Sequence, residues 1–154
     1  LNADTPDEPF KVFQERVRGL EYSISHYDNH FYIVTNLNNA TNFKLMKTPE
    51  TATQLANWTD VIPHRDNVLL EDIDIFKNFL VISERTNGLN LIRIKSWDNS
   101  EDYYLPFDNE TYSAYTSTNV DFDTVMLRYG YNSMTTPSST IDFNSSLTSK
   151  SPSL

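Results

Sequence analysis

The stretch Phe79-Leu80-Val81-Ile82-Ser83-Glu84 opens with consecutive apolar residues, and Phe31-Tyr32-Ile33-Val34-Thr35 has the same character. β-branched and aromatic residues of this kind fit the interior of a β-sheet. A third apolar run begins at Val125, so the three runs start at positions 31, 79 and 125, which are 48 and 46 residues apart. This regular spacing indicates that one structural unit is repeated along the chain.

Shorter strand-like segments accompany each apolar run in the same order. Turns rich in Asp, Asn or Gly separate these segments, because such residues readily adopt turn conformations. The expected strands are residues 21–26, 31–35, 43–47 and 60–62, then 69–76, 79–84, 89–94 and 103–105, and finally 112–117, 124–129 and 139–143. The third set lacks a fourth strand, and the residues that follow it are polar.

Four strands per repeat and a period of roughly 40–50 residues are typical of β-propeller blades. A blade cannot bury both of its faces alone, so it stacks against its neighbours. We therefore predict an all-β fold, a β-propeller fragment of about three four-stranded antiparallel blades, with a Greek-key β-sandwich as the alternative. The predicted units are 1–18 as the tail of a preceding blade, 19–66 and 67–108 as blades, 109–144 as an incomplete blade and 145–154 as a polar tail.

The composition excludes several classes of protein. The 154 residues include no Cys, which rules out disulfides, zinc ribbons, iron–sulfur clusters and thiol nucleophiles. With 12 Lys and Arg against 21 Asp and Glu, the net charge is −9, which argues against a nucleic-acid partner. No apolar run reaches the length of about 18 residues that suggests a transmembrane helix, so no membrane partner is expected. Residues 1–4 have neither the pattern of a signal peptide nor an initiator Met, so we expect a piece of a longer protein.

The three glycines narrow the chemistry further. Gly19, Gly88 and Gly130 lie far apart in the sequence. A dinucleotide fingerprint or a phosphate loop needs clustered glycines, so that the backbone can approach the phosphates closely. A nucleophile elbow needs Gly on both sides of a Ser. None of these motifs can be formed here, and we expect no cofactor.

Two groups of side chains could bind a metal ion. His26 and His30 flank a segment that contains Asp28, and a pair of His with a carboxylate is a zinc-binding set. The segment between them is typical of a hairpin turn, so two surface histidines beside a turn are the simpler interpretation. Asp72 and Asp74 alternate along an expected strand and would share one of its faces. The pair could act as acid and base or bind calcium, or it could line a solvated or channel-facing strand.

Two arginines stand out because of their neighbours. Arg65 follows an expected strand in Ile62-Pro63-His64-Arg65, and Arg128 lies between aromatic and apolar residues in Leu127-Arg128-Tyr129. A guanidinium group in such a place can stack on rings or bind a carboxylate through two hydrogen bonds. The structural interpretation is that both arginines form ion pairs between neighbouring blades.

Several of these segments, in order along the chain, resemble one family. The longest is Leu127-Arg128-Tyr129-Gly130-Tyr131-Asn132-Ser133-Met134-Thr135-Thr136-Pro137, and together the matches run from about residue 1 to residue 137. The chain is similar to the propeller of the oligopeptidase B (protease II) group in the prolyl oligopeptidase family of serine peptidases. Further matching segments are Gly19-Leu20-Glu21-Tyr22-Ser23, Asn42-Phe43-Lys44-Leu45, Ile62-Pro63-His64-Arg65 and Leu80-Val81-Ile82.

The resemblance implies a function for the longer protein. Enzymes of this group carry a seven-bladed propeller over an α/β-hydrolase domain that holds the Ser-Asp-His triad, and they cleave short peptides after Arg or Lys. The chain would supply about the last three blades before that domain, so its partners would be the hydrolase domain and short basic peptides. No catalytic residue of the family can be placed on this sequence, so the chain alone should be inactive. The alternatives are a stand-alone propeller-type binding module and a metal-dependent hydrolase. We expect a cytoplasmic protein, with the periplasm as the alternative compartment.

Overall fold

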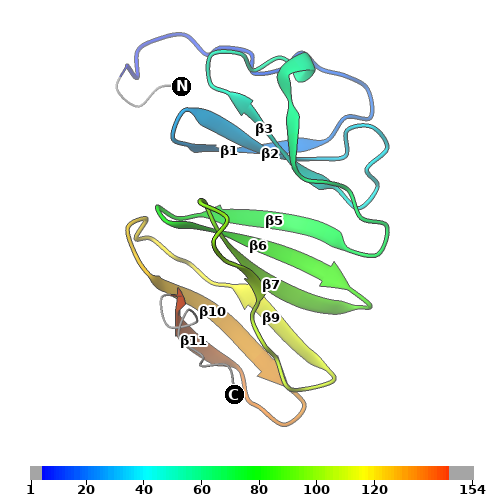
Figure 1. Ribbon diagram of the computed structural model, residues 1–154, viewed down its shortest axis with the longest axis vertical. Coiled ribbons are helices and arrows are strands. Elements are labelled where there is room, and N and C mark those ends of the chain that lie inside the picture. The colour runs from blue at the N-terminus through cyan, green and yellow to red at the C-terminus, as the bar shows by residue number, and fades with distance from the viewer. Residues whose placement is uncertain (1–4, 146–154) are drawn as a thin grey trace.

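The computed structural model describes residues 5–145 and consists of three antiparallel β-sheets packed one on another. Figure 1 shows the sheets as successive layers along the longest axis of the molecule, in chain order from the blue strands to the orange ones. Within each sheet, strands that are consecutive in sequence are also hydrogen-bonded neighbours. The all-β fold made of stacked blades is therefore confirmed.

The first sheet contains four strands in the order β1-β2-β3-β4. Its first hairpin is tight, because the β1–β2 turn contains only the two residues between Tyr27 and His30, which pair across it. A short 3₁₀ helix, η1 (Leu55–Asn57), lies between the last two strands. The strands are β1 (Tyr22–Tyr27), β2 (His30–Thr35), β3 (Lys44–Pro49) and β4 (Thr59–Ile62).

The second sheet repeats this order as β5-β6-β7-β8. Its β6–β7 hairpin turns on Asn87 and Gly88, whose φ angles of 50° and 80° are both positive. A two-residue turn with two positive φ angles matches the twist of the strands that it joins, and Asn-Gly is the sequence that adopts it most readily. The strands are β5 (Leu69–Ile75), β6 (Phe79–Thr86), β7 (Leu89–Ser96) and β8 (Asp102–Tyr104).

The third sheet has three strands in the described part of the chain, in the order β11-β10-β9. The strands are β9 (Tyr112–Thr116), β10 (Met126–Ser133) and β11 (Ser139–Asn144). Ser145 closes this sheet, because its N–H and its hydroxyl both donate hydrogen bonds to the Val125 carbonyl, at 2.9 and 3.0 Å. The rest of the predicted polar tail, residues 146–154, lies outside the described residues.

Two apolar cores separate the three sheets, and β6 contributes to both. Val81 and Ile82 are adjacent in sequence and fully buried, yet Ile82 belongs to the core between the first and second sheets and Val81 to the core between the second and third. Side chains of a strand alternate between its faces, so a central strand covered on both faces carries a continuous apolar run, here residues 79–82. The first core contains Tyr32, Val34, Leu45, Ile62, Leu70, Ile73, Leu80 and Ile82, and the second contains Phe76, Phe79, Val81, Ile92, Ile94, Leu105, Ala114, Leu127, Tyr129 and Tyr131.

The segment before β1 packs on the outer face of the first sheet. Its Phe13 ring contacts Phe31 edge-on at a centroid distance of 5.0 Å, and it also lies against a small core that includes Trp58. Residues 5–21 form no strand before β1. The assignment of residues 1–18 to a preceding blade, and the blade boundaries 19–66, 67–108 and 109–144, stay predictions.

Candidate functional site

The structure does not bring the predicted metal ligands together. The His26 ring nitrogen Nε2 lies 3.1 Å from Oε2 of Glu50, at the end of the β3 strand, rather than beside Asp28. The Asp28 carboxylate instead accepts a hydrogen bond from the side-chain amide of Asn29 at 3.3 Å. In residues 5–145, no group of three or more His, Cys, Asp or Glu side chains is placed to hold a metal ion.

Asp72 and Asp74 lie on β5 and differ in their surroundings. Asp72 is exposed and accepts a hydrogen bond from the Ile73 backbone N–H at 2.9 Å. Asp74 is half-buried and accepts a hydrogen bond from the hydroxyl of Thr116 on β9. Burial raises the pKa of Asp74 above its ordinary value, and the nearby charge of Asp72 adds to this effect, although the Thr116 hydrogen bond opposes it. The first strands of the second and third sheets, β5 and β9, thus meet at a half-buried carboxylate.

Arg65 forms an ion pair between blades, as predicted. It lies on the linker from the first sheet to the second, and its guanidinium group binds the carboxylate of Glu84 on β6 and donates a hydrogen bond to the Tyr104 hydroxyl at 3.2 Å. Glu84 is fully buried. A buried carboxylate is tolerated only when it is paired and fully hydrogen-bonded, and Arg65 supplies the main part of that pairing.

Further groups of the second sheet complete the polar network around Glu84. Tyr104 donates a hydrogen bond to Glu84 Oε2 at 2.7 Å, and burial together with this bond raises the pKa of the Tyr104 hydroxyl. Arg93 lies 3.6 Å from the other oxygen of Glu84, and it also binds Asp102 through two hydrogen bonds of 2.5 and 2.7 Å. The network therefore ties the linker from the first sheet to β6, β7 and β8 of the second sheet.

Arg128 does not pair between blades, so this part of the prediction is wrong. Its guanidinium group binds Asp142 through two hydrogen bonds of 2.7 and 2.9 Å, and Asp142 lies directly opposite it on the neighbouring strand of the same sheet. Oppositely charged residues at facing positions of an antiparallel pair meet without any help from another sheet. Both side chains are about half exposed, at 52% and 45%, so the pair is solvent-screened.

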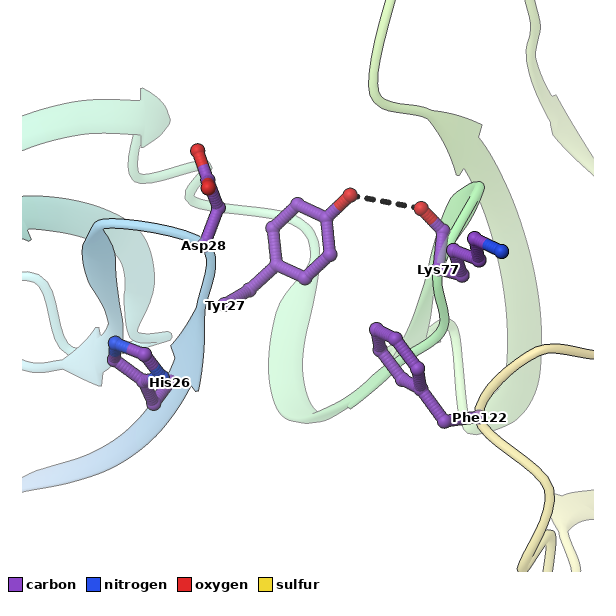
Figure 2. A pocket seen from close by; sticks show the side chains of 5 residues that line it. All are labelled: His26, Tyr27, Asp28, Lys77 and Phe122. Carbon is purple, nitrogen blue, oxygen red and sulfur yellow. Dashed lines mark hydrogen bonds between the residues drawn. The ribbon is translucent and has the colours of Figure 1, made fainter. Parts of the chain in front are cut away.

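A pocket of about 390 Å³ lies where the turns of all three sheets converge. Figure 2 shows Tyr27 in its centre, with His26 and Asp28 on one side and Lys77 and Phe122 on the other. Tyr27 comes from the end of β1, Lys77 from the β5–β6 turn and Phe122 from the loop before β10. The pocket therefore exists only when the three sheets are stacked.

Two hydrogen bonds to backbone carbonyls and one ion pair fix the parts of this pocket relative to one another. The Tyr27 hydroxyl donates to the Lys77 carbonyl at 2.7 Å, which joins the first sheet to the second (Figure 2). The Lys77 N–H donates to the Phe122 carbonyl at 3.0 Å, and the Lys77 ammonium binds Asp123 at 2.6 Å, which joins the second sheet to the third. Trp97 stacks on Tyr27 with a centroid distance of 4.2 Å and an interplanar angle of 9°.

The pocket offers binding surface rather than a catalytic constellation. It combines aromatic rings with one carboxylate, one imidazole and one ammonium group, and no hydroxyl–imidazole–carboxylate chain is formed by its lining. The sequence pattern singled out His26 and Asp28 but missed Tyr27, Trp97 and Phe122. These aromatic residues lie in or beside turns up to 95 positions apart, and only the stacking of the sheets brings them together.

Comparison with known proteins agrees with the stacked sheets. The model of the prolyl oligopeptidase N-terminal β-propeller domain matches residues 1–153, which is nearly the whole chain. The chain belongs to this family. Membership accounts for the repeated antiparallel sheets, since the matched domain is the propeller of these peptidases.

Relatives in the family are much longer than this chain. Dipeptidyl aminopeptidase BI of Pseudoxanthomonas mexicana is 39% identical over 135 residues, which are 88% of this chain and 18% of the relative. Protease 2 of Moraxella lacunata is 26% identical over 144 residues, which are 94% and 20% of the two chains. The structure of oligopeptidase B from Trypanosoma brucei is 29% identical with a TM-score of 0.75, covering 84% of this chain and 19% of that one. The chain thus spans about a fifth of the length of these proteins.

No helix within residues 5–145 is long and apolar enough to cross a membrane.

Removal of the buried carboxylate of Glu84 should destabilise the stack. Glu84→Ala removes the hydrogen-bond acceptor of Arg65 and Tyr104 and the nearby negative charge beside Arg93, and we expect the free energy of unfolding to fall by about 3 kcal/mol. Asp142→Ala is the matched control, because it breaks an exposed pair and should cost less than about 1 kcal/mol. Urea denaturation followed by tryptophan fluorescence measures both. Equal losses in the two variants would contradict the proposed role of Glu84.

Asp74 should make stability depend on pH in a defined direction. Because its pKa is raised in the folded state, the ionised carboxylate lowers the free energy of unfolding at neutral pH. This loss of stability disappears as the pH falls below the ordinary pKa of 3.8. We expect Asp74→Asn to be more stable than the unmodified chain at pH 7, and the difference to vanish near pH 3. Asp72→Asn should also raise stability at pH 7, but by less, because it removes only the neighbouring charge that adds to the rise in the Asp74 pKa. Urea denaturation at both pH values tests this, and a destabilised Asp74→Asn at pH 7 would contradict it.

Proposed function

We propose that the chain restricts access to the catalytic domain of a longer peptidase, which cleaves short peptides after Arg or Lys. The observation that carries this proposal is the match of nearly the whole chain to the propeller domain of the prolyl oligopeptidase family. Likeness to protease 2 and to oligopeptidase B extends over more than four-fifths of the chain, and the choice of basic peptides rests on the resemblance to that group. We further propose that the partner of the propeller is a hydrolase domain in the same parent chain.

A domain that restricts access in this way needs sheets that do not separate easily. Both faces of the second sheet are covered by apolar cores, and burial of each large aliphatic side chain contributes about 1.5–3 kcal/mol. Sheets packed in this way would exclude a folded protein by size while a flexible peptide passes. The net charge of −9 would attract basic peptides and raise their concentration near the surface of the propeller.

A second candidate is a parent enzyme that releases dipeptides from the amino terminus of its substrates. The observation that favours it is the 39% identity with a protein named dipeptidyl aminopeptidase BI, which exceeds the 26% identity with protease 2. The propeller would have the same excluding role in this case, but the catalytic domain would recognise a free amino terminus. A stand-alone binding module is the remaining alternative, and its support is the pocket between the turns.

Two fluorogenic substrates separate these proposals. One substrate carries a blocked amino terminus and Arg before the scissile bond, and the other is an unblocked dipeptide. The purified chain should hydrolyse neither, and the full-length parent should cleave the blocked Arg substrate. A parent that cleaves only the unblocked dipeptide would support the second candidate. Turnover by the chain itself, surviving stringent purification, would contradict the assignment of a purely excluding role.

A further inference from the structure

We propose that the pocket between the turns binds a cationic group of a peptide, either an Arg or Lys side chain or the terminal amino group. The proposal deepens the proposed function, on which its choice of ligand rests, by placing a recognition site on the propeller itself. The relevant surface is formed by Tyr27, Asp28 and Phe122, with Trp97 beneath Tyr27. Figure 2 shows Asp28 and Phe122 on opposite sides of the Tyr27 ring.

The aromatic wall of the pocket is held in place before any ligand arrives. Trp97 covers one face of Tyr27, and its indole N–H donates to the Phe76 carbonyl at 2.9 Å. Tyr27 lines the pocket, so the part of its ring that its neighbours leave uncovered is what the pocket can present to a ligand. Phe122 lies with its ring centroid 6.2 Å from that of Tyr27 and is 50% exposed. Electron-rich ring faces attract cations, and Arg stacks on them readily.

The charges around these rings favour a positive ligand. Lys77 is paired with Asp123, and His26 is bonded to Glu50, so each of these cationic or basic groups already has an acidic partner. Asp28, by contrast, forms no ion pair with any residue in the range 5–145, and its carboxylate accepts only the weak hydrogen bond from Asn29 described above. The pocket therefore carries an uncompensated negative charge beside aromatic rings. A cation over a ring with a carboxylate within reach gains both attractions.

Asp28 can be neutralised without disturbing the turn. Its φ angle is 53°, in the left-handed region, which Asn tolerates as well as Asp does. Asp28→Asn should therefore preserve the β1–β2 hairpin while it removes the charge. Glu110→Gln is the matched control, because it neutralises an exposed acidic residue that does not line the pocket.

The indole signals of Trp97 and Trp58 report the result in the intact chain. Trp97 stacks on the pocket residue Tyr27, whereas Trp58 is buried in the small core on the outer face of the first sheet and serves as the internal reference. A ¹H–¹⁵N titration compares acetyl-arginine methylamide, which has only a side-chain cation, with alanyl-alanine amide, which has only an amino-terminal cation. Acetyl-citrulline methylamide, nearly isosteric with the first ligand but neutral, is the third arm.

We expect one or both cationic ligands to shift the Trp97 signal while Trp58 stays unchanged, and citrulline to have no effect. Asp28→Asn should weaken binding by about fivefold or more, and Glu110→Gln should change it by less than about twofold. Equal binding of citrulline, full affinity in Asp28→Asn, or no Trp97 shift at all would overturn the proposal. The measurement needs no peptidase activity, so its failure would leave the proposed function of the parent standing.

Discussion

The stacking of the three sheets depends on burying both faces of the second sheet at once. Val81 and Ile82 are adjacent on β6, are fully buried and belong to different cores, so neither the first nor the third sheet can be removed without exposing one of them. A single four-stranded sheet of this composition would leave a large apolar surface in water. The repeated blade is therefore a consequence of burial, and each blade is stable only as the neighbour of another.

Two sets of polar contacts complete this arrangement at different places. Arg65 connects the linker after the first sheet to the buried Glu84 of the second. At the turns, Tyr27 and Lys77 connect successive sheets through hydrogen bonds to backbone carbonyls. The pocket results from the second set of contacts, those between the turns. It joins groups from three sheets, so a binding function there is coupled to the integrity of the stack. The half-buried Asp74, in contrast, works against stability at neutral pH, because burial raises the pKa of its carboxyl group.

Local patterns predicted the strands but not every partner. The apolar runs and the Asn-Gly turn at 87–88 placed each strand within a few residues of its observed bounds, because alternation and turn chemistry act over short distances. Arg65 was correctly expected to bridge blades, whereas Arg128 binds Asp142 on the next strand of its own sheet. The error arose because strand register, which decides facing pairs, is not visible in a single strand. The aromatic pocket was missed for a similar reason, since Tyr27 and Phe122 meet only through tertiary packing.

The most direct test of the stacked arrangement is a set of distances between methyl groups of different sheets. With Ile, Leu and Val methyl groups labelled, nuclear Overhauser effects should connect the first sheet with the second, among Val34, Leu45, Leu80 and Ile82. They should also connect the second sheet with the third, between Leu127 and members of the set Val81, Ile92 and Ile94. Effects confined to residues of the same sheet would contradict the account, because they would show that the blades do not bury each other.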